Sequence, residues 1–322
     1  MLVLIADKLA AHAVSALRDL GPEVVVRPEL KADTLPDALR QTAASILIVR
    51  STEVTATALA ASDALRLVIR AGAGVNTIDV GAATQRKIAV SNTPGKNGIA
   101  VAELAMGLML ALDRRLPDAV ADLRQGRWRK SFYGQSRGLY GRRLGLVGFG
   151  AIGREVAKRA QAFGMHVGAF DVLLDDDTAE SLGVSRYAEL EALFAECDVV
   201  SVHVPYNTKT KHLVNAALIG KMKPGALLVH TARGGVVDDA ALVAAVKEGK
   251  IRAALDVFED EPVGGDDAYA GPMRDVAGIY ATPHIGASTD QAQDAVAEEA
   301  VAIVKGFLDS GTVANLVNVE IL

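Results

Sequence analysis

Gly148-Phe149-Gly150-Ala151-Ile152-Gly153 decides the fold of this chain, because an apolar run precedes it and a helical pattern follows it. Residues 143–147 have the pattern of a short buried strand, and residues 154–159 have that of a helix. In a strand–GxGxxG–helix unit, the glycines permit a tight turn, a close backbone approach to a pyrophosphate and close packing of helix on strand. The start of the helix also offers unpaired N–H groups to phosphates. We therefore predict that a dinucleotide is bound by Gly148, Gly150, Ala151, Ile152 and Gly153.

The next predicted strand, residues 165–170, runs directly into Asp171. Asp171 lies 18 residues beyond Gly153, where such units place an acidic residue on the adenosine ribose. Its carboxylate would accept hydrogen bonds from the ribose hydroxyls and would repel a 2′-phosphate. We expect the cofactor NAD in preference to NADP. The alternative is a glycine turn and a solvated aspartate without a ligand.

Outward from this unit, short β-branched runs alternate with amphipathic stretches along almost the whole chain. This alternation predicts an α/β fold with two Rossmann-like or flavodoxin-like domains, each built on a parallel sheet. A first set of strands is expected at 2–5, 24–26, 46–49, 67–69 and 88–90, and a second set at 144–147, 166–170, 199–203, 227–230, 253–256 and 279–281. Helices are expected at 9–20, 34–44 and 54–62, and a last helix, 289–308, could return to the first domain.

Residues 101–112 are apolar nearly all round and predict a fully buried helix. This helix could lie in a domain core, or it could be buried partly against a second subunit. Residues 113–142 are polar and read as irregular, and this length exceeds that of an ordinary loop. We interpret them as a functional segment or an interaction arm.

Length and composition narrow the class of protein. A chain of 322 residues is expected to form two domains, and 50% hydrophobic residues suffice for a large core. The net charge of −5 favours neither nucleic acid nor a membrane surface as a partner, and an acidic small molecule would need a local cluster of cations. The only cysteine, Cys197, suits a reducing compartment, and we find no signal peptide or membrane span. We expect a cytoplasmic protein.

Three polar residues follow late strands of the second set. Arg233, Glu261 and His284 come after the strands expected at 227–230, 253–256 and 279–281. Ligands of open α/β sheets bind beyond the carboxyl ends of the strands, where all three residues fall. Histidine can exchange a proton near neutral pH, and arginine offers a permanent fork to a carboxylate. On spacing alone they could also be a surface arginine, a surface glutamate and a capped loop histidine. The other histidines and Cys197 lack the spacing of metal ligands, so no metal site is expected.

The phrases around these residues resemble the D-isomer-specific 2-hydroxyacid dehydrogenases over essentially the whole chain. The resemblance rests on GAGVNTID at 72–79, NTPGKN at 92–97, the GFGAIG turn, HVP at 203–205, KPGA at 223–226, TARGGVVD at 231–238, DVF at 256–258 with EP at 261–262, and TPHIGAST at 282–289. It implies that a nucleotide domain, residues 99–287, is inserted into a substrate-binding domain formed by residues 1–98 and 288–322.

The resemblance also implies roles for individual residues. His284 would exchange the proton of the C2 hydroxyl, Glu261 would pair with His284, and Arg233 would hold the substrate carboxylate. On the cofactor side it implies contacts from His203, Val204 and Pro205 at the adenosine end, and from Thr231, Ala232, Arg233, Asp256, His284 and Gly286 around the nicotinamide, with Asp256 at its carboxamide. Backbone amides of Ala73, Gly74 and Val75 would receive the substrate carboxylate.

Four stretches, 49–55, 70–75, 126–132 and 232–238, are most similar to family members that oxidise D-3-phosphoglycerate to 3-phosphohydroxypyruvate for serine biosynthesis. A phosphorylated acid needs further cations, for which Arg50 is the first candidate and Arg129 and Lys130 are the next. In the family the arm wraps a neighbouring subunit, so the resemblance implies a homodimer through residues 99–142. The basic stretch 124–130 could instead be solvated and pinned by Trp128.

Two departures from those members stand out. The arm has one residue fewer between Trp128 and Phe132, and no serine-sensing domain follows Leu322, so feedback by serine is not expected. The short form also resembles reductases of hydroxypyruvate and glyoxylate, which is the alternative activity. A remote alternative is a non-catalytic NAD sensor similar to the corepressors that share this fold, although such a sensor gains nothing from Arg233, Glu261 and His284.

Overall fold

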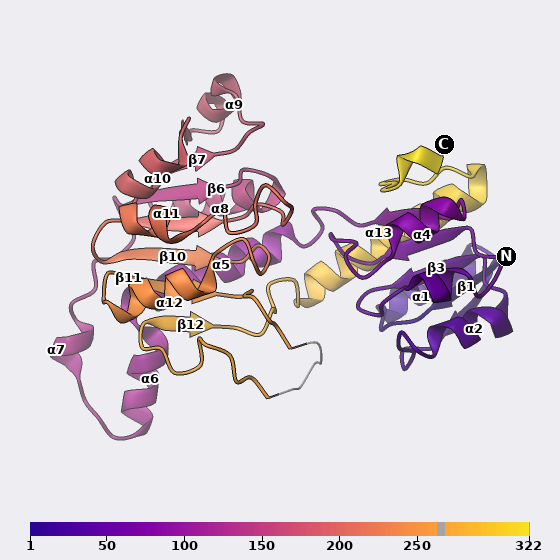
Figure 1. Cartoon of the computed structure of the whole chain (residues 1–322), viewed down its shortest axis with the longest axis horizontal. Coiled ribbons are helices and arrows are strands. Elements are labelled where there is room, and N and C mark those ends of the chain that lie inside the picture. Colours follow the sequence, from indigo (N-terminus) through magenta and orange to yellow (C-terminus); the bar gives the residue numbers. More distant parts are fainter. Residues whose placement is uncertain (263–267, 322) are drawn as a thin grey trace. The chain divides into compact units, whose positions relative to one another are not determined.

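The computed structural model describes residues 1–262 and 268–321 of the chain. It divides the chain into two compact units (Figure 1). The first unit comprises Met1–Asn97 and Ser288–Leu322, and the second comprises Gly98–Ala287. The second unit is therefore inserted, along the sequence, into the first. We describe each unit by itself.

The first unit is built on a five-stranded parallel sheet in the order β2-β1-β3-β4-β5. Its strands are β1 (Leu2–Ile5), β2 (Glu23–Val26), β3 (Ile46–Val49), β4 (Leu67–Arg70) and β5 (Ala89–Asn92), and its helices are α1 (Ala11–Asp19), α2 (Leu35–Thr42), α3 (Ala56–Leu59), α4 (Val80–Gln85) and α13 (Asp290–Ser310), followed by the 3-10 helix η1 (Val319–Ile321). Side chains of a strand alternate between faces, so Val3 and Ile5 pack toward α1 and α13 while Leu4 packs toward α2 and α3. Burial on both faces explains why these strands are continuously apolar.

The second unit is built on a seven-stranded parallel sheet in the order β12-β11-β10-β9-β6-β7-β8. The strands are β6 (Arg143–Val147), β7 (His166–Phe170), β8 (Ser185–Arg186), β9 (Val199–Val202), β10 (Ala226–His230), β11 (Ile251–Leu255) and β12 (Ile279–Ala281). The chain winds outward from β6 in one direction through β7 and β8, then returns to β9 on the other side of β6. The neighbours β6 and β9 therefore form the switch point at which such sheets bind nucleotides.

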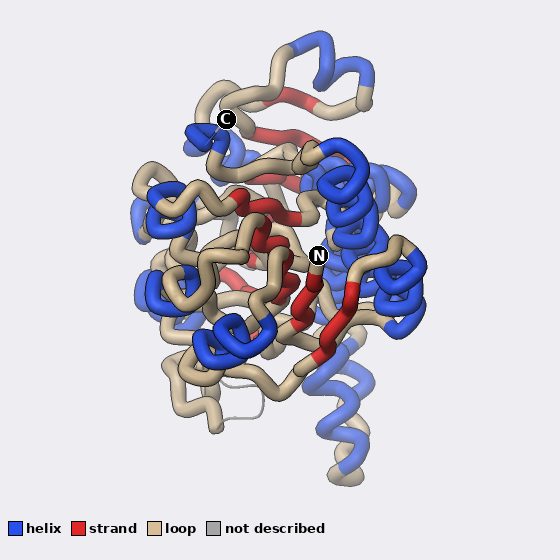
Figure 2. The backbone as a smooth tube through the Cα atoms, turned by 90° about the vertical axis from the view of Figure 1, so that its right-hand side faces the viewer, coloured by secondary structure: helices blue, strands red, loops and turns tan. Residues whose placement is uncertain are grey.

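Helices cover both faces of this second sheet, and Figure 2 shows the same arrangement for the first unit, which faces the viewer. One face packs against α5 (Gly98–Arg114) and α8 (Ala151–Ala162), and the other packs against α10 (Leu190–Glu196), α11 (Ala216–Lys221) and α12 (Asp239–Lys247). A further short helix, α9 (Asp176–Ser181), precedes β8. The two parallel sheets with their helices confirm the predicted fold class. No described helix has the length and apolar character that crossing a membrane requires.

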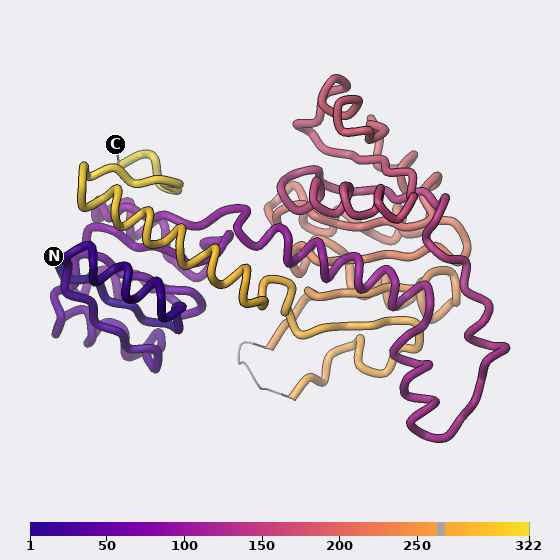
Figure 3. Tube along the Cα trace, turned by 180° about the vertical axis from the view of Figure 1, so that it is seen from behind, coloured from indigo at the N-terminus to yellow at the C-terminus, as the bar shows by residue number. Residues whose placement is uncertain are grey.

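The predicted arm differs from its expected form. Residues 113–142 were expected to be irregular, but they contain α6 (Leu116–Arg124) and α7 (Lys130–Tyr133), which extend away from the sheet (Figure 3). Arg115 adopts a left-handed φ of 51°, which ends the run of α5, and Pro117 stands in the first turn of α6, where its missing N–H costs nothing. The strand β8 was also missed, because two residues are too short to show a pattern.

The helix α5 is less buried in this single chain than its composition predicts. Val101, Ala105 and Met109 are buried, whereas Glu103 and Gly107 are exposed. The buried side packs onto α8 and the sheet of its own unit. The exposed side of α5 is available for burial against a second subunit.

Candidate active site

The glycine turn of the second unit has the shape that a bound dinucleotide requires. Gly148 has a φ of +98°, and a Cβ there would lie 2.8 Å from the carbonyl oxygen of His203. A Cβ on Gly153 would lie 2.3 Å from the carbonyl oxygen of Gly148. Around Gly150, by contrast, a Cβ would meet no described atom within 4 Å. Two glycines thus close the turn, and the third leaves open space at the start of α8.

The start of α8 is suited to an anion. Gly150 is the N-cap and offers no side chain to the first N–H groups of the helix, so those donors and the positive end of the helix dipole face outward. Asp171, the residue after β7, lies beside this turn. Its Oδ2 accepts a hydrogen bond from the Phe149 N–H at 2.7 Å, and its Oδ1 accepts one from the Leu173 N–H at 2.8 Å. The carboxylate therefore lies beside the glycine turn, and its contact with a ribose stays a prediction.

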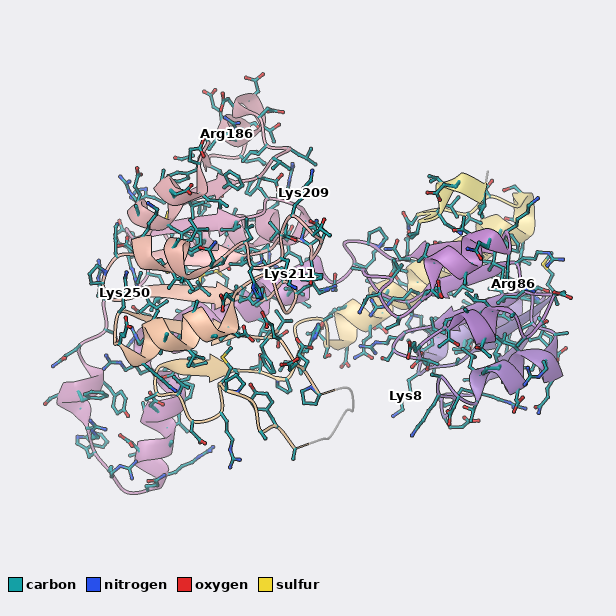
Figure 4. The ribbon with its side chains drawn as sticks, viewed as in Figure 1. Lys8, Arg86, Arg186, Lys209, Lys211 and Lys250 are labelled. Atoms are coloured by element: carbon teal, nitrogen blue, oxygen red, sulfur yellow. The ribbon has the colours of Figure 1, made fainter. Side chains whose placement is uncertain are left out.

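His203 directly follows β9, the other strand of the switch point. Its backbone N–H donates to the Val147 carbonyl at 2.7 Å, and its Nε2 is 2.8 Å from the Ser201 hydroxyl. Desolvation, with His230 nearby, lowers the pKa of His203 to about 3, so the ring is neutral near pH 7. The loop beyond Pro205 carries the exposed Lys209 and Lys211 (Figure 4).

His284 and Glu261 form a direct pair. Nδ1 of His284 is 2.7 Å from Oε2 of Glu261, and the other carboxylate oxygen accepts a hydrogen bond from the Phe258 N–H at 3.1 Å. The carboxylate fixes the tautomer, because an Nδ1–H must face it. Nε2 is then the atom available for proton exchange, and no residue of the described part bonds to it. The His284 side chain is 48% exposed, as a group that meets a substrate must be.

Asp256 holds the loop that carries His284. This carboxylate is only 2% exposed, and it accepts hydrogen bonds from the Thr282 hydroxyl at 2.6 Å, the Ile285 N–H at 2.9 Å and the Gly286 N–H at 2.7 Å. His284 itself has a φ of +53°, a strained conformation that the three bonds on either side of it maintain. The sequence assigned Asp256 to the nicotinamide carboxamide. That contact stays a prediction, whereas the support of the loop was not foreseen.

Arg233 lies in a turn that packs directly on the segment leading to Glu261. A Cβ on Gly234 would lie 2.1 Å from the Phe258 carbonyl oxygen, so only glycine permits this approach. Nη1 of Arg233 donates to the Ala232 carbonyl at 2.6 Å. The two loops after β10 and β11 are therefore in contact, and the loop after β12 is tied to them through Asp256. The structure thus brings Arg233, Glu261 and His284 to the same end of the sheet.

The predicted residues of the first unit follow β3 and β4. The Asp7 carboxylate accepts hydrogen bonds from the N–H groups of Arg50, Ser51 and Thr52 at 2.6 to 3.1 Å, which fixes the backbone behind the Arg50 side chain. Asn92 fixes the next turn by donating from Nδ2 to the Ala73 carbonyl at 2.6 Å.

Arg70 is a functional candidate that the sequence interpretation did not single out. A Cβ on Gly72 would lie 1.7 Å from Nη1 of Arg70, and Nε of Arg70 donates to the Arg50 carbonyl at 3.1 Å. The guanidinium therefore lies across the glycine at the start of the turn 72–75, beside the backbone of Arg50. The signal available in the sequence was Gly72, two residues after Arg70, because a glycine leaves room for this close approach.

The cations of the arm have other partners. Nη1 of Arg129 is 3.2 Å from the Asp122 carboxylate, and its guanidinium lies 4.1 Å from the centre of the Phe132 ring. Asp122 also accepts hydrogen bonds from Arg127 and from the Tyr133 hydroxyl. These bonds lower the pKa of Asp122 to about 2. The arm is thus organised around its own ion pairs. Among the described residues, no three His, Cys, Asp or Glu side chains are grouped so that they could hold a metal ion.

The parallel sheet and the glycine turn at its switch point define a nucleotide-binding α/β protein. Residues 106–286 match the family model described as "D-isomer specific 2-hydroxyacid dehydrogenase, NAD binding domain". The chain belongs to this family, and its cofactor is NAD, as the glycine turn and Asp171 predicted.

Curated relatives carry two different names. A D-3-phosphoglycerate dehydrogenase of Methanocaldococcus jannaschii is 42% identical over 98% of this chain and 60% of its own length. A hydroxypyruvate reductase of Thermotoga maritima is 43% identical over 92% of this chain and 94% of its own length. The chain thus spans about 60% of the length of the phosphoglycerate dehydrogenase.

Solved structures agree in fold over nearly the whole chain. A D-lactate dehydrogenase of Aquifex aeolicus, complexed with NAD and lactic acid, has a TM-score of 0.84 at 28% identity and covers 99% of this chain and 98% of its own. An NAD-bound 3-phosphoglycerate dehydrogenase of Entamoeba histolytica has a TM-score of 0.80 at 28% identity, with the same coverage of both chains.

Proposed function

We propose that the protein oxidises D-3-phosphoglycerate to 3-phosphohydroxypyruvate with NAD, reversibly, at the start of serine biosynthesis. The observation that carries the proposal is the 2.7 Å pair between His284 Nδ1 and Glu261 Oε2, at the end of the sheet that also bears Arg233 and the glycine turn. A chain that only sensed NAD would not need this pair. The names of the relatives support the choice of acid.

The proposed chemistry divides between the cofactor and the chain. Bound NAD supplies the acceptor for the hydride that leaves C2 of the hydroxy acid. The chain moves the proton: Nε2 of His284 removes it from the C2 hydroxyl, while Glu261 orients the ring and stabilises the charge that the ring acquires. The guanidinium of Arg233 holds the substrate carboxylate and polarises the forming carbonyl.

The residues of the second unit fit the cofactor. The open space at Gly150, the uncapped start of α8 and the carboxylate of Asp171 are suited to a pyrophosphate and a ribose. We assign the adenosine end to His203, Val204 and Pro205. We assign the nicotinamide end to Thr231, Ala232, Asp256 and Gly286, which lie where the neighbouring strands end.

In the first unit we assign the substrate carboxylate to the backbone amides of Ala73, Gly74 and Val75. For the phosphate we propose Arg50, whose backbone N–H donates to Asp7, and Arg70, whose guanidinium lies over Gly72. Arg129 is a weaker candidate, because Asp122 and Phe132 already engage its guanidinium.

A steady-state assay that follows the NADH absorbance band tests this function. We expect turnover of 3-phosphoglycerate with a higher kcat/KM than for glycerate or 2-hydroxyglutarate. His284→Ala should lower kcat by about 10²- to 10⁴-fold, the usual contribution of a general base. Absence of turnover with every 2-hydroxy and 2-keto acid would favour a sensor instead.

The phosphate assignment has a matched control. Arg50→Ala and Arg70→Ala should raise the KM for 3-phosphoglycerate but not for glycerate. Arg86→Ala removes a cation of the first unit that pairs with Asp63 and is labelled in Figure 4, and it should leave both KM values unchanged. Equal effects on both acids would contradict a phosphate site at these arginines.

Reduction of hydroxypyruvate is the second candidate. It is favoured by the Thermotoga maritima relative, which is 43% identical and matched over 94% of its length. Its substrate lacks the phosphate, so Arg50→Ala and Arg70→Ala should then have little effect. Comparing kcat/KM for hydroxypyruvate and 3-phosphohydroxypyruvate, each with NADH, decides between the two activities.

We also propose a homodimer formed through α5 and the arm. The apolar side chains of Leu116, Val120 and Leu123 lie on one side of α6 and are 47% to 58% exposed, and Trp128 is 77% exposed. Grouped exposed apolar residues mark protein interfaces. Light scattering should show a dimer that Leu123→Asp converts to a monomer, whereas the same charge at the exposed Leu182 should not. A monomeric wild-type protein would contradict the proposal.

A cytoplasmic location fits the one cysteine. Cys197 is buried, and burial raises the pKa of its thiol to about 11, so the thiol is unreactive. A chain without an internal disulfide is suited to a reducing compartment.

A further inference from the structure

His230 is a buried histidine for which neither the sequence nor the proposed chemistry provides a role. It is the last residue of β10 and is fully buried, with 0% of its surface exposed. Its Nε2 is 3.0 Å from the carbonyl oxygen of Arg233. Its Nδ1 is buried and has no hydrogen-bond partner in the described part of the chain.

These contacts define the state of the ring. A carbonyl oxygen only accepts hydrogen bonds, so Nε2 must carry the proton. Burial lowers the pKa of His230 to about 4, so near neutral pH the ring is neutral and Nδ1 is an acceptor without a donor. A buried acceptor of this kind lowers the stability of the fold, and such groups are rare in native proteins. An unfavourable group that lies next to a functional loop points to a role there.

His230 also joins the loops of the candidate site. Its backbone carbonyl accepts a hydrogen bond from the Asp256 N–H at 2.9 Å, and Asp256 supports the loop of His284. Its ring holds the Arg233 carbonyl from one side, while Gly234 packs on Phe258 from the other. The backbone at residue 233 is therefore held on both sides. Because the Arg233 guanidinium donates to the neighbouring Ala232 carbonyl, its position depends on the position of that backbone.

We propose that His230 is a positioning residue for Arg233: its Nε2–H holds the Arg233 carbonyl and thereby places the guanidinium where it meets the substrate carboxylate. The inference rests on the proposed dehydrogenase function. It assigns no contact between His230 and the substrate. Small displacements of a binding group lower catalysis strongly, so the ring needs only to fix the turn.

Two variants separate positioning from folding. His230→Leu removes the donor but also removes the unpartnered Nδ1, and the Arg233 carbonyl keeps the bond from the Val236 N–H at 3.3 Å. We therefore expect an unchanged or higher melting temperature together with a fall in kcat/KM of about 10- to 100-fold. His230→Gln keeps a donor at a similar reach and should restore most of the activity. NADH affinity should change by less than about twofold in both variants, since neither disturbs the glycine turn.

Leu228→Ala is the matched control, because Leu228 is a fully buried residue on the same strand and face. It should lower the melting temperature and leave kcat/KM nearly unchanged. This pattern is the reverse of that expected for His230→Leu. A purely structural role of His230 would instead lower stability and activity together.

A double-mutant cycle with Arg233→Ala tests the route of the effect. If His230 acts through the guanidinium, His230→Leu causes no further loss of kcat/KM in the Arg233→Ala protein. An equal loss in both backgrounds would overturn the proposal, as would full activity of His230→Leu. If the wild-type protein turns over no 2-hydroxy acid, the proposed function itself is wrong and this inference falls with it, which is a different result from an active wild type with an unaffected variant.

Discussion

At the scale of single residues, the site depends on one buried carboxylate more than on its exposed groups. Asp256 accepts three hydrogen bonds from Thr282, Ile285 and Gly286, which flank His284. His284 in turn keeps a left-handed backbone conformation that an isolated loop would leave. The pairing of His284 with Glu261 therefore depends on a residue that was expected to contact the cofactor.

Asp256→Asn should weaken the hydrogen bonds that support the His284 loop. The amide presents an NH₂ group in place of one oxygen, so one of the three donors loses its acceptor. We expect the free energy of unfolding to fall by about 1–3 kcal/mol, and kcat/KM to fall by about tenfold or more because His284 is displaced. Thr282→Val removes only the hydroxyl donor and should have a much smaller effect on activity. Chemical denaturation and steady-state kinetics measure both quantities. Unchanged kcat/KM in a destabilised Asp256→Asn protein would show that the loop does not need this carboxylate to place His284.

At the same scale, we predict that Asp171 determines the choice between NAD and NADP. Asp171→Asn keeps an oxygen for the Phe149 N–H but removes the negative charge that repels a 2′-phosphate. We expect the ratio of kcat/KM for NAD to that for NADP to fall by about one to two orders of magnitude, where each factor of ten is worth ~1.4 kcal/mol. Asp171→Ala also removes the acceptor and should weaken the binding of both cofactors. An unaltered ratio in Asp171→Asn would mean that another group excludes NADP.

At the scale of elements, the sequence predicted the strands and turns that are determined by local patterns of residues. The strands Leu2–Ile5, Ile46–Val49 and His166–Phe170 lie as expected, because their apolar runs are buried on both faces and end at polar residues. The glycines of the turn were also predictable, since Gly148 and Gly153 are required by close approaches within one strand–turn–helix unit. The helix α6 was not predictable in the same way, because its apolar face is exposed and its surroundings are polar.

A buried ion pair fixes the junction between α5 and β6. Nη1 of Arg142 is 3.0 Å from the Asp113 carboxylate, which also accepts the Gly138 N–H at 2.9 Å, and both side chains are nearly fully buried. Asp113→Ala leaves a buried guanidinium without its counter-charge and should cost about 3–5 kcal/mol of unfolding free energy. The paired change Asp113→Leu with Arg142→Met should cost clearly less, since neither charge remains. Urea denaturation followed by circular dichroism measures both, and an equal loss in the single and double variants would contradict the ion-pair argument.

At the scale of the whole molecule, the parallel sheet explains why residues far apart in sequence share one site. Arg233, Glu261 and His284 follow β10, β11 and β12, which are neighbours in the sheet. Their loops therefore meet at the carboxyl end of these three strands. The position of each residue after a predicted strand was enough to place it at this end of the sheet. It could not predict the support that Asp256 gives to the His284 loop, or the contacts of Arg70 and His230, because these depend on how the loops pack on each other. Such contacts are tertiary and leave no local pattern.

The buried histidines give the stability of the second unit a definite pH dependence. Burial lowers the pKa of His230 to about 4 from its ordinary value of 6.5, and desolvation lowers that of His203 to about 3. In the unfolded chain both rings take up a proton near pH 6.5, whereas in the folded unit they do not. The contribution of the two histidines to the free energy of unfolding is therefore fully present above pH 6.5. It falls as the pH drops from 6.5 toward 4, by up to ~1.4 kcal/mol per pH unit for each histidine.

Asp239 opposes this trend. Burial raises its pKa from 3.8 to about 6, so the folded unit binds a proton there before the unfolded chain does, and stability from this group rises as the pH falls from 6 toward 3.8. Urea denaturation from neutral pH down to about 4, followed by far-ultraviolet circular dichroism, measures the sum. Fluorescence is a poor probe, because the one tryptophan, Trp128, is 77% exposed. His230→Leu should flatten the dependence, and Asp239→Asn should steepen it because it removes the opposing group. A slope that neither change alters would mean that these buried groups do not govern the acid stability of the second unit.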